Sequence, residues 1–559
     1  MRIRELKTTN DRSFALGSLN VLIGPNNAGK SQTLRDINTR IVSPTSRAVV
    51  VSEVVPEKPP RFEDLLVGLT VHNNPNNATQ SQLFGLQGNL TNGHSQPVQM
   101  EKLERRYQGT ENMMEMASEL GRFWTAHLDA ATRLQIASGC PSHNVASNPP
   151  ERLPQALYDA GIDAELELRN VFRRTFSLDI RLDYSNLQQF VFRIAEDFGS
   201  VPADPREAYP IMQRFSTLDN QGDGYRSFVG VVLALLFCSN RIVLIDEPEA
   251  FLHPMQARQL GQWIGEHVLR SRGQVIIATH DPSFLMGTLS SGAPVDIFRL
   301  QRTGTETNFH HVSPQSIEAI AASPLLSSQR VLESLFHSGV VVCEADADRA
   351  LYQLVADKYL GRSDLFFLHA HNRQTLAHVV ELLRECCVPV CAIADLDLLT
   401  SEPEFKALYK ALTSSELPEE EKVLRHSVAA KIADVNEADA LQRVEQAIAQ
   451  LLEEIRGGRR DLSSVRSAVN DVRKKSSRWA AIKGGIGRVP TSVECELLDL
   501  IARMGAVGLY LVPVGELEGW IDVPDVSRKS EWIARALRMV HTQGPPHGLK
   551  EFVSTLVPR

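Results

Sequence analysis

Short apolar runs that end in polar or charged residues recur along the whole chain. They occupy 19–23, 242–245 and 274–278 in the first half, and 340–343, 388–394 and 509–514 in the second half. Runs of this length without polar alternation are typical of strands buried on both faces of a parallel sheet. Apolar positions at helical spacing follow some of them, as in 255–269. Strands that alternate with helices predict an α/β fold, with ligand groups at the carboxyl ends of the strands.

The pattern is weaker between about 43 and 200. Segments 73–97 and 139–154 are rich in Asn, Gln, Gly, Ser and Thr, which predicts loops, the first of them mobile. Helical spacing returns in 100–136 and 165–176, and 178–194 favours strand. We therefore expect inserted arm or dimerisation elements here, within a larger first lobe.

A glycine-rich loop follows the first apolar run. Its residues read GPNNAGKS, which fits the P-loop pattern G-x-x-x-x-G-K-[ST]. The glycines let backbone N–H groups turn toward phosphate oxygens, and the helix expected near Ser31 points its positive end at the same anion. Lys30 would contact the β- and γ-phosphates, and Ser31 would reach a bound Mg²⁺. The predicted ATP-binding residues are Gly24, Pro25, Asn26, Asn27, Ala28, Gly29, Lys30 and Ser31.

Two later strand ends carry residues suited to nucleotide chemistry. The run 242–245 ends in Asp246 and Glu247, where Asp246 is suited to hold the Mg²⁺ shell and Glu247 to orient or deprotonate the attacking water. His280 follows the run 274–278 and could sense the γ-phosphate. Taken singly, an acidic pair can cap a helix and a strand-end His can be a core residue. The P-loop upstream favours the nucleotide site.

A second anion-binding element is expected at 220–224, which reads NQGDG and precedes an apolar helix at 228–238. Glycines at the start of a helix leave its N–H groups accessible to an anion. In ABC-type ATPases the segment at this position closes over the ATP held by a partner subunit. Gln221 and Gly222 are therefore candidate nucleotide contacts, and an ordinary turn with a helix cap is the alternative.

The second half carries an acidic set at its strand ends. Glu344 follows the run 340–343, and Asp395 and Asp397 follow the run 388–394. Side chains at positions i and i+2 of a strand face the same way, so both aspartates could reach one point near Glu344. Because all the donors are oxygens, the set suits Mg²⁺ or Mn²⁺ and not zinc. Such clusters support two-metal phosphodiester hydrolysis, whereas acids that merely decorate a loop edge are the alternative.

Composition sets limits on the class of protein. The chain has 559 residues, of which 43% are hydrophobic and 23% charged, which suggests two to four globular domains. No apolar stretch is long enough to span a membrane, and the first residues lack the apolar core of a signal peptide. The seven cysteines show no paired C-x-x-C spacing, so we expect a reduced, cytoplasmic protein. The formal net charge of −8 does not by itself indicate nucleic-acid binding, although a locally basic groove would suffice.

Together these motifs resemble the OLD (overcoming lysogenisation defect) family. GPNNAGKS, NQGDGYRSF, VLIDEPEAFLHP and ATHDPSFL are similar to the ABC-type ATPase half of that family. Glu344 with the Asp395/Asp397 pair resembles the Toprim fold of topoisomerases, primases and OLD nucleases. The resemblance implies an ABC-type ATPase domain at 1–325, with the inserted elements at about 43–200, followed by a Toprim nuclease domain at 326–559. The Q-G-D-G signature departs from the usual S-G-G, and this leaves ATP hydrolysis open.

The resemblance also implies further residues of a nuclease site. Asp348 falls on an acidic position used in the family, and 509–520 resembles the last acidic motif, with Glu518 preferred as the metal ligand and Glu516 second. Either glutamate could instead be a carboxylate at a helix start. The family also uses a Lys that stabilises charge on the phosphate. Lys529 fits that place best by sequence, and Lys550 and Lys483 are rivals.

A charged helical insert is expected at about 402–477. Basic residues concentrate near its end, at Arg456, Arg459, Arg460, Arg473, Lys474, Lys475 and Arg478, beside Trp479. They could follow a phosphate backbone, or they could belong to a solvated helical pair. Lys483, Gly484 and Gly485 would then form a flexible return to the sheet.

The function expected from all this is a DNA endonuclease that needs Mg²⁺ or Mn²⁺ and is regulated by ATP. The resemblance implies a role in prokaryotic anti-phage defence, a homodimer or higher homo-oligomer, and partners such as a helicase or a retron reverse transcriptase with its RNA and DNA. The alternative is a non-cutting ABC-type ATPase, a sensor or DNA-organising protein whose Toprim half only binds DNA or a partner. A primase or topoisomerase is less favoured, because the chain has no zinc module and no context for a strand-passage Tyr.

Overall fold

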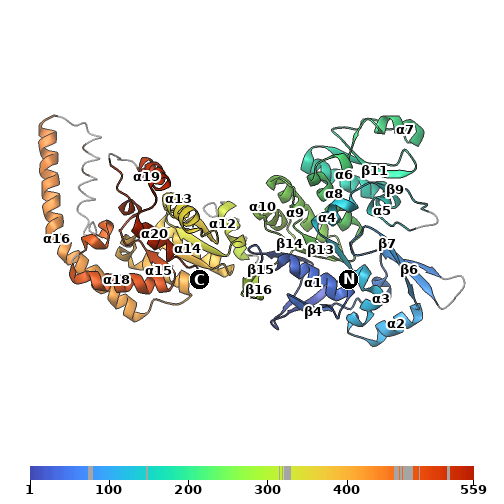
Figure 1. Ribbon diagram of the computed structural model, residues 1–559, viewed down its shortest axis with the longest axis horizontal. Coiled ribbons are helices and arrows are strands. Elements are labelled where there is room, and N and C mark those ends of the chain that lie inside the picture. Colours follow the sequence, from blue (N-terminus) through green and yellow to red (C-terminus); the bar gives the residue numbers. More distant parts are fainter. Residues whose placement is uncertain are drawn as a thin grey trace. The chain divides into compact units, whose positions relative to one another are not determined.

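The chain folds into two compact units, Met1–Ala321 and Ala322–Arg559 (Figure 1). The computed structural model describes the chain except for 74–79, 146–148, 314, 318, 320–328, 459–464, 466–468, 470–481, 490 and 525–528. In 432–443, and at positions 329, 454 and 529, it describes the backbone alone. The basic residues from Arg459 to Arg478 and Trp479 therefore lie outside the described residues.

The first unit is organised around a six-stranded sheet in the order β16-β15-β3-β14-β13-β8. The strands from β15 to β8 are parallel to their neighbours, and β16 closes one edge antiparallel to β15. The expected apolar runs form its centre, which confirms the α/β class. The strands are β3 (Leu19–Ile23), β8 (Thr125–Leu128), β13 (Ile242–Asp246), β14 (Gln274–Ala278), β15 (Asp296–Thr303) and β16 (Glu306–Val312).

Helices follow three of these strands directly, and each start has a local cause. Gly29 at φ 100° ends the P-loop and begins α1 (Lys30–Val42). Pro254 opens α9 (Pro254–Val268), where proline loses no hydrogen bond. Asp281 caps α10 (Pro282–Leu289) by accepting from the N–H groups of Ser283 and Phe284. The sheet also packs against α4 (Ala130–Ile136) through β8, and α8 (Asp223–Phe237), which is apolar from Phe228 onward, packs against α4.

Three smaller antiparallel sheets complete the first unit. One has the order β2-β1-β4, a second joins β10, β11 and β12 with β9, and a third is β5-β6-β7. Their strands are β1 (Ile3–Thr8), β2 (Ser13–Ala15), β4 (Val51–Pro56), β5 (Thr70–Asn73), β6 (Ser81–Leu86), β7 (Gly93–Val98), β9 (Cys140–Pro141), β10 (Asp179–Asp183), β11 (Gln189–Ala195) and β12 (Ser216–Thr217). The accompanying helices are α2 (Met100–Gly109), α3 (Ala117–Trp124), α5 (Leu153–Ala160), α6 (Ile162–Phe176) and α7 (Pro205–Met212).

Two sequence-based expectations fail in this region. Segment 73–97 is not simply a mobile loop, because β6 and most of β7 lie in it and pair from Ser81 to Val98. Segment 100–136 is not continuously helical, because β8 interrupts it and joins β13 at the edge of the central sheet. In both cases the partner strand supplies the hydrogen bonds, and local spacing does not reveal that partner.

The second unit contains a parallel four-stranded sheet in the order β18-β17-β19-β20. This is the Rossmann-like parallel sheet expected of a Toprim domain, and its central strands are fully buried. The strands are β17 (Gly339–Cys343), β18 (Leu365–His369), β19 (Val390–Ala394) and β20 (Leu509–Leu511). The helices are α12 (Gln329–Glu333), α13 (Asp346–Val355), α14 (Arg373–Glu385), α18 (Thr491–Ala506), α19 (Lys529–Gln543) and α20 (His547–Ser554).

The charged insert lies between β19 and β20. It begins with α15 (Glu402–Thr413), which packs on α14, and continues as the long α16 (Glu419–Arg456), which contacts α18. Figure 1 shows α16 extending beyond the sheet of its own unit. In the described part of the chain, no helix combines the length and apolar character needed to cross a membrane.

Candidate functional site

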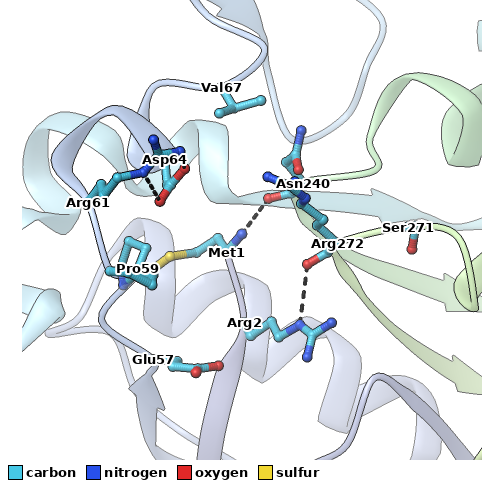
Figure 2. Close-up of a pocket in the computed structure, with 11 residues that line it drawn as sticks. Met1, Arg2, Glu57, Pro59, Arg61, Asp64, Val67, Asn240, Ser271 and Arg272 are labelled. Atoms are coloured by element: carbon cyan, nitrogen blue, oxygen red, sulfur yellow. Dashed lines mark hydrogen bonds and ion pairs between the residues drawn. The ribbon is translucent and has the colours of Figure 1, made fainter.

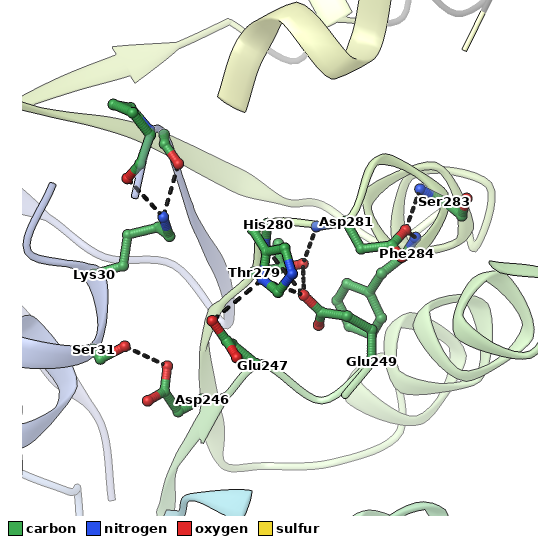
Figure 3. Close-up of polar contacts among 12 residues, drawn as sticks. Lys30, Ser31, Asp246, Glu247, Glu249, Thr279, His280, Asp281, Ser283 and Phe284 are labelled. Carbon is green, nitrogen blue, oxygen red and sulfur yellow. Dashed lines mark hydrogen bonds and ion pairs between the residues drawn. The ribbon is translucent and has the colours of Figure 1, made fainter. Parts of the chain in front are cut away.

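The P-loop follows β3, and the side chain of its lysine is hydrogen-bonded to backbone carbonyl groups of the same loop (Figure 3). Gly24 has φ 132°, and a Cβ there would lie 2.3 Å from the carbonyl oxygen of Leu300, so only glycine fits this turn. Lys30 Nζ donates to the carbonyl oxygens of Gly24 at 2.7 Å and Pro25 at 3.0 Å. Burial lowers the pKa of Lys30, and the nearby acids work against that shift. The loop thus presents a buried cation and a helix start at one place, which fits a triphosphate.

The two acids after β13 face the P-loop as expected. Ser31 Oγ donates to Asp246 Oδ1 at 2.8 Å, which joins the two residues predicted to share a Mg²⁺. Burial raises the pKa of Asp246, and the charge on Glu247 adds to that effect, whereas the bond from Ser31 opposes it. An all-oxygen Ser–Asp pair with a destabilised negative charge fits Mg²⁺ in donor chemistry.

Glu247 and His280 are brought together, and a third acid joins them. His280 Nδ1 lies 3.2 Å from Glu247 Oε1, and this bond lowers the pKa of Glu247 and raises that of His280. Glu249, which we did not single out from sequence, is buried behind them and accepts from Thr279 Oγ1 at 2.7 Å and from the His280 N–H at 3.1 Å. The third carboxylate of the D-E-P-E run at 246–249 is the signal in the sequence that could have identified it.

Gln221 and Gly222 lie where α8 begins. Gly222 is the N-cap residue of α8, and a Cβ built on it would meet no atom within 4 Å. The start of this helix is therefore open on the surface of the first unit. The structure gives these two residues no contact with the P-loop of the same chain.

In the second unit the acidic residues gather at the carboxyl end of the parallel sheet. Glu344 follows β17, and its Oε1 accepts from the backbone N–H of Asp395, which follows β19, at 3.1 Å. Asp348 lies in the first turn of α13, is buried, and accepts from the Ala345 N–H at 2.9 Å. The D-x-D segment itself is not a strand, because β19 ends at Ala394 and Leu396–Thr400 forms a 3₁₀ turn. The turn, and not strand alternation, sets the directions of Asp395 and Asp397.

The buried acids repel one another. Burial raises the pKa of Glu344 to about 7, with the charge on Asp397 adding to it and the Asp395 N–H opposing it. Burial also raises the pKa of Asp395 to about 8, and the charges on Glu344, Asp348, Asp397 and Glu516 add to that shift. Like charges held together away from water favour a bound cation or a proton.

Asp397 is held by two cations. Arg373, at the start of α14, donates from Nη1 to Asp397 Oδ1 at 2.5 Å and also binds Glu404. Lys483 Nζ lies 3.7 Å from Asp397 Oδ2 and pairs with Glu516. Arg373 is a further site residue that we did not identify from sequence, where it appears only as one charge among many.

The structure brings Lys483, a rival candidate in the sequence, to the acids. Gly515 has φ 93°, and a Cβ there would lie 2.2 Å from the carbonyl oxygen of Lys483, so this close approach needs glycine. The turns Ile482–Gly484 and Ile486–Arg488 are thus packed against 513–515 and are not a flexible return. Burial lowers the pKa of Lys483, but Glu516 and the aspartates outweigh it and raise the pKa overall.

The remaining candidates are Lys529, Lys550 and Glu518. Lys529 begins α19, and its side chain lies outside the described residues, whereas Lys550 lies exposed in α20. Glu518 is half-buried in the turn Leu517–Trp520. The charge of Glu516 adds to the raised pKa of Asp395.

The acidic residues at this end of the sheet offer the oxygen ligands that a divalent metal prefers, but they are not arranged as a metal centre. In the ranges that the structure describes, no group of three or more His, Cys, Asp or Glu side chains could hold a metal ion as it stands. The oxygens of Asp397 face Arg373 and Lys483 instead. A metal ion bound by Asp397 would therefore have to displace Arg373 or Lys483 from this carboxylate. Carboxylate oxygens are otherwise the ligands that Mg²⁺ and Mn²⁺ take.

A separate cavity of about 440 Å³ lies in the first unit at the opposite edge of the central sheet (Figure 2). Asn240 and Arg272, which line it, precede β13 and β14, so it lies at the amino ends of these strands. Arg2 Nε donates to the Arg272 carbonyl oxygen at 3.2 Å, and Arg61 pairs with Asp64. None of the expected site residues line this cavity.

Comparison with known families matches one segment in each unit. A family described as "AAA domain, putative AbiEii toxin, Type IV TA system" matches residues 211–286, which include α8, β13, α9 and β14. A family described as "Overcoming lysogenization defect protein-like, TOPRIM domain" matches residues 335–397, which include Glu344, Asp395 and Asp397. An ATPase domain is thus followed by an OLD-like Toprim domain.

Several solved structures follow a distantly similar course over about half of the chain. The SmcHead bound to the C-winged helix domain of ScpA has a TM-score of 0.34 and 11% identity, and covers 57% of this chain and 100% of its own. The SMC head domain from Thermotoga maritima has a TM-score of 0.29 and 14% identity, and covers 56% of this chain and 100% of its own. A comparison with curated proteins gave no match.

Proposed function

We propose that this chain, whose ATPase domain followed by an OLD-like Toprim domain matches an OLD-family fusion, is an ATP-regulated DNA endonuclease that depends on Mg²⁺ or Mn²⁺. The observation that carries the proposal is the contact between Glu344 and Asp395 from separate strands, with Asp397, Glu516 and Lys483 beside them. Acids and a cation at one sheet edge suit the binding and cleavage of a phosphodiester.

The chain's own residues have distinct tasks in this proposal. A divalent metal bound by the acids would activate water and stabilise the leaving oxygen of the phosphodiester. Lys483 stands beside the acids and is the better candidate than Lys529 to neutralise charge on the scissile phosphate. Arg373 pairs with Asp397, and its guanidinium would be available to a second phosphate oxygen if Asp397 instead held the metal.

The first unit supplies regulation. Lys30 and Ser31 bind ATP with Mg²⁺, and Glu247 with His280 lies where an attacking water would be oriented. The open start of α8 at Gly222 suits closure of a second copy over the bound ATP, which makes the active form a homodimer or higher oligomer. ATP hydrolysis, as distinct from ATP binding, is part of this proposal.

The test is cleavage of supercoiled plasmid DNA by the full chain with Mg²⁺ or Mn²⁺, with and without ATP. E344A, D395A and K483A are expected to lose nicking by about a hundredfold or more, the scale typical of lost catalytic groups. E531Q is the matched control, because Glu531 is a half-exposed acid that pairs with Arg535 on α19. Nicking by D395A at the wild-type rate would refute the assignment.

The second candidate is a non-cutting ATPase whose Toprim half only binds DNA or a partner. The hold of Arg373 and Lys483 on Asp397 favours it, because this pairing neutralises the acid without a metal. DNA binding that is unchanged by EDTA, with intact plasmid under every metal and nucleotide condition, would support this candidate over the nuclease.

The biological setting is proposed from the family likeness alone. Anti-phage defence in a prokaryotic cytoplasm suits an endonuclease kept inactive until a trigger acts on its ATPase. A helicase or a retron reverse transcriptase with its RNA and DNA is the proposed class of partner. Reduced plating of phage on cells that carry the wild-type gene, and normal plating with D395A, would test this setting.

A further inference from the structure

A completely buried arginine, Arg133, lies beneath the acids of the nucleotide site. Arg133 is on α4, is 0% exposed, and no described carboxylate lies within ion-pair distance of it. Its Nη1 donates to the carbonyl oxygens of Leu128 at 3.1 Å and of Asp246, and its Nη2 donates to that of Glu247 at 2.9 Å. A buried charge that binds main-chain carbonyls in place of a carboxylate fixes the backbone that carries those carbonyls.

The backbone at Glu247 needs such support. Glu247 has φ 50°, a left-handed conformation that is unfavourable for a residue with a side chain. Its N–H donates to the Ala278 carbonyl oxygen at 2.8 Å, and its own carbonyl accepts from Arg133 and from the Ala250 N–H at 3.0 Å. This conformation directs the Glu247 carboxylate toward His280, 3.2 Å away.

Arg133 also connects these carbonyls to α8. Its Nε donates to Ser227 Oγ at 3.0 Å, and Ser227 is completely buried. One turn later, a Cβ on Gly230 would lie 2.3 Å from the Arg133 carbonyl oxygen, so α8 and α4 touch through their backbones. At the start of α8, a Cβ on Gly224 would lie 2.6 Å from the Phe251 carbonyl oxygen, in the segment just after Glu247.

We propose that Arg133 is a positioning residue that couples α8 to Glu247. A shift of α8, which starts at Gly222, moves Ser227 and Gly230 and is transmitted through the guanidinium to the Asp246 and Glu247 carbonyls. Contact of a second copy with the α8 start thereby changes where the Glu247 carboxylate stands relative to bound ATP. The inference rests on the nucleotide site of the proposed function and adds a route by which that site responds to α8.

Amide hydrogen exchange of the full chain tests the coupling without any turnover. R133K keeps the charge but cannot reach the Asp246, Glu247 and Leu128 carbonyls together, and S227A removes the link to α8 alone. Both should raise exchange in peptides covering 246–252 by about tenfold or more. R226K is the matched control, because Arg226 joins α8 to α4 through Leu134 and Ser138 but contacts no residue of 246–252. Exchange that R133K leaves unchanged would overturn the inference.

ATP turnover gives the second readout. R133K should lower kcat by about tenfold with KM and nucleotide binding unchanged, and should not lower the residual rate of E247Q further, because both changes act through one carboxylate. A drop of equal size in the E247Q background would refute positioning through Glu247. If the wild type hydrolyses no ATP, the hydrolysis part of the proposed function is wrong. The hydrogen-exchange result still decides the role of Arg133 in that case. If R133K does not fold, S227A decides by the same two readouts.

Discussion

Replacing Asp395 with Asn should stabilise the metal-free protein at alkaline pH. The pKa of Asp395 is raised from 3.8 to about 8, so the folded state binds a proton that the unfolded state has lost. Stability from this group is fully present below about pH 4 and is lost as the pH rises through about 8. At about 1.4 kcal/mol for each pH unit, this corresponds to roughly 6 kcal/mol at most, part of which belongs jointly to Glu344.

D395N removes the charge and keeps the backbone N–H that Glu344 accepts. In EDTA at pH 8.5 we therefore expect a gain of about 2–4 kcal/mol, which is a rise in Tm of roughly 5–10 °C. At pH 5 the gain should fall to about a third of that, because the carboxyl group of the unfolded chain is still ionised above pH 3.8. A saturating concentration of Mn²⁺ should stabilise the wild type and leave D395N unchanged, since only the acid binds the ion.

Thermal unfolding followed by differential scanning fluorimetry at the two pH values measures both effects. D364N is the control, because Asp364 lies in the same unit but pairs with Arg362, which lowers its pKa. D364N should show no gain at pH 8.5 and the wild-type response to Mn²⁺. If D395N is no more stable than the wild type at pH 8.5, or responds equally to Mn²⁺, the acids are neither mutually repelled nor a metal site.

Three further outcomes are expected. K30A should weaken binding of a fluorescent ATP analogue by at least about tenfold, because it removes the buried cation of the P-loop; binding at wild-type affinity would exclude this loop as the site. K483A should abolish nicking in the plasmid assay, whereas K550A should cut normally. Loss of nicking in K550A with normal nicking by K483A would instead assign the phosphate-contacting role to Lys550. D179N should cost about 3 kcal/mol in urea unfolding at pH 7, because it leaves Arg169 and Arg173, both 2.6 Å from Asp179, without their partner. Burial opposes the shift, but these arginines lower the pKa of Asp179, so the loss should shrink only as the pH falls below about 4; a constant difference down to pH 2 would contradict it.

Local patterns were enough to predict the parallel sheets and the residues at their ends. The apolar runs became β3, β13 and β14 in one unit and β17, β19 and β20 in the other, because unalternated apolar strands are stable only when buried on both faces. The glycines of the P-loop could also be identified from the local pattern, because the positive φ values of Gly24 and Gly29 are a requirement of the loop itself.

What the sequence alone determined about this protein is therefore its class and the strand ends where chemistry gathers. Only the tertiary structure decided which distant groups meet there: β8 beside β13, Lys483 beside the acids, and Arg133 under Glu247. These pairings join residues far apart in the chain, and their energy comes from packing and from burial of polar groups. Periodicity and spacing along the sequence are local properties, so they do not predict which distant residues come into contact in the folded chain.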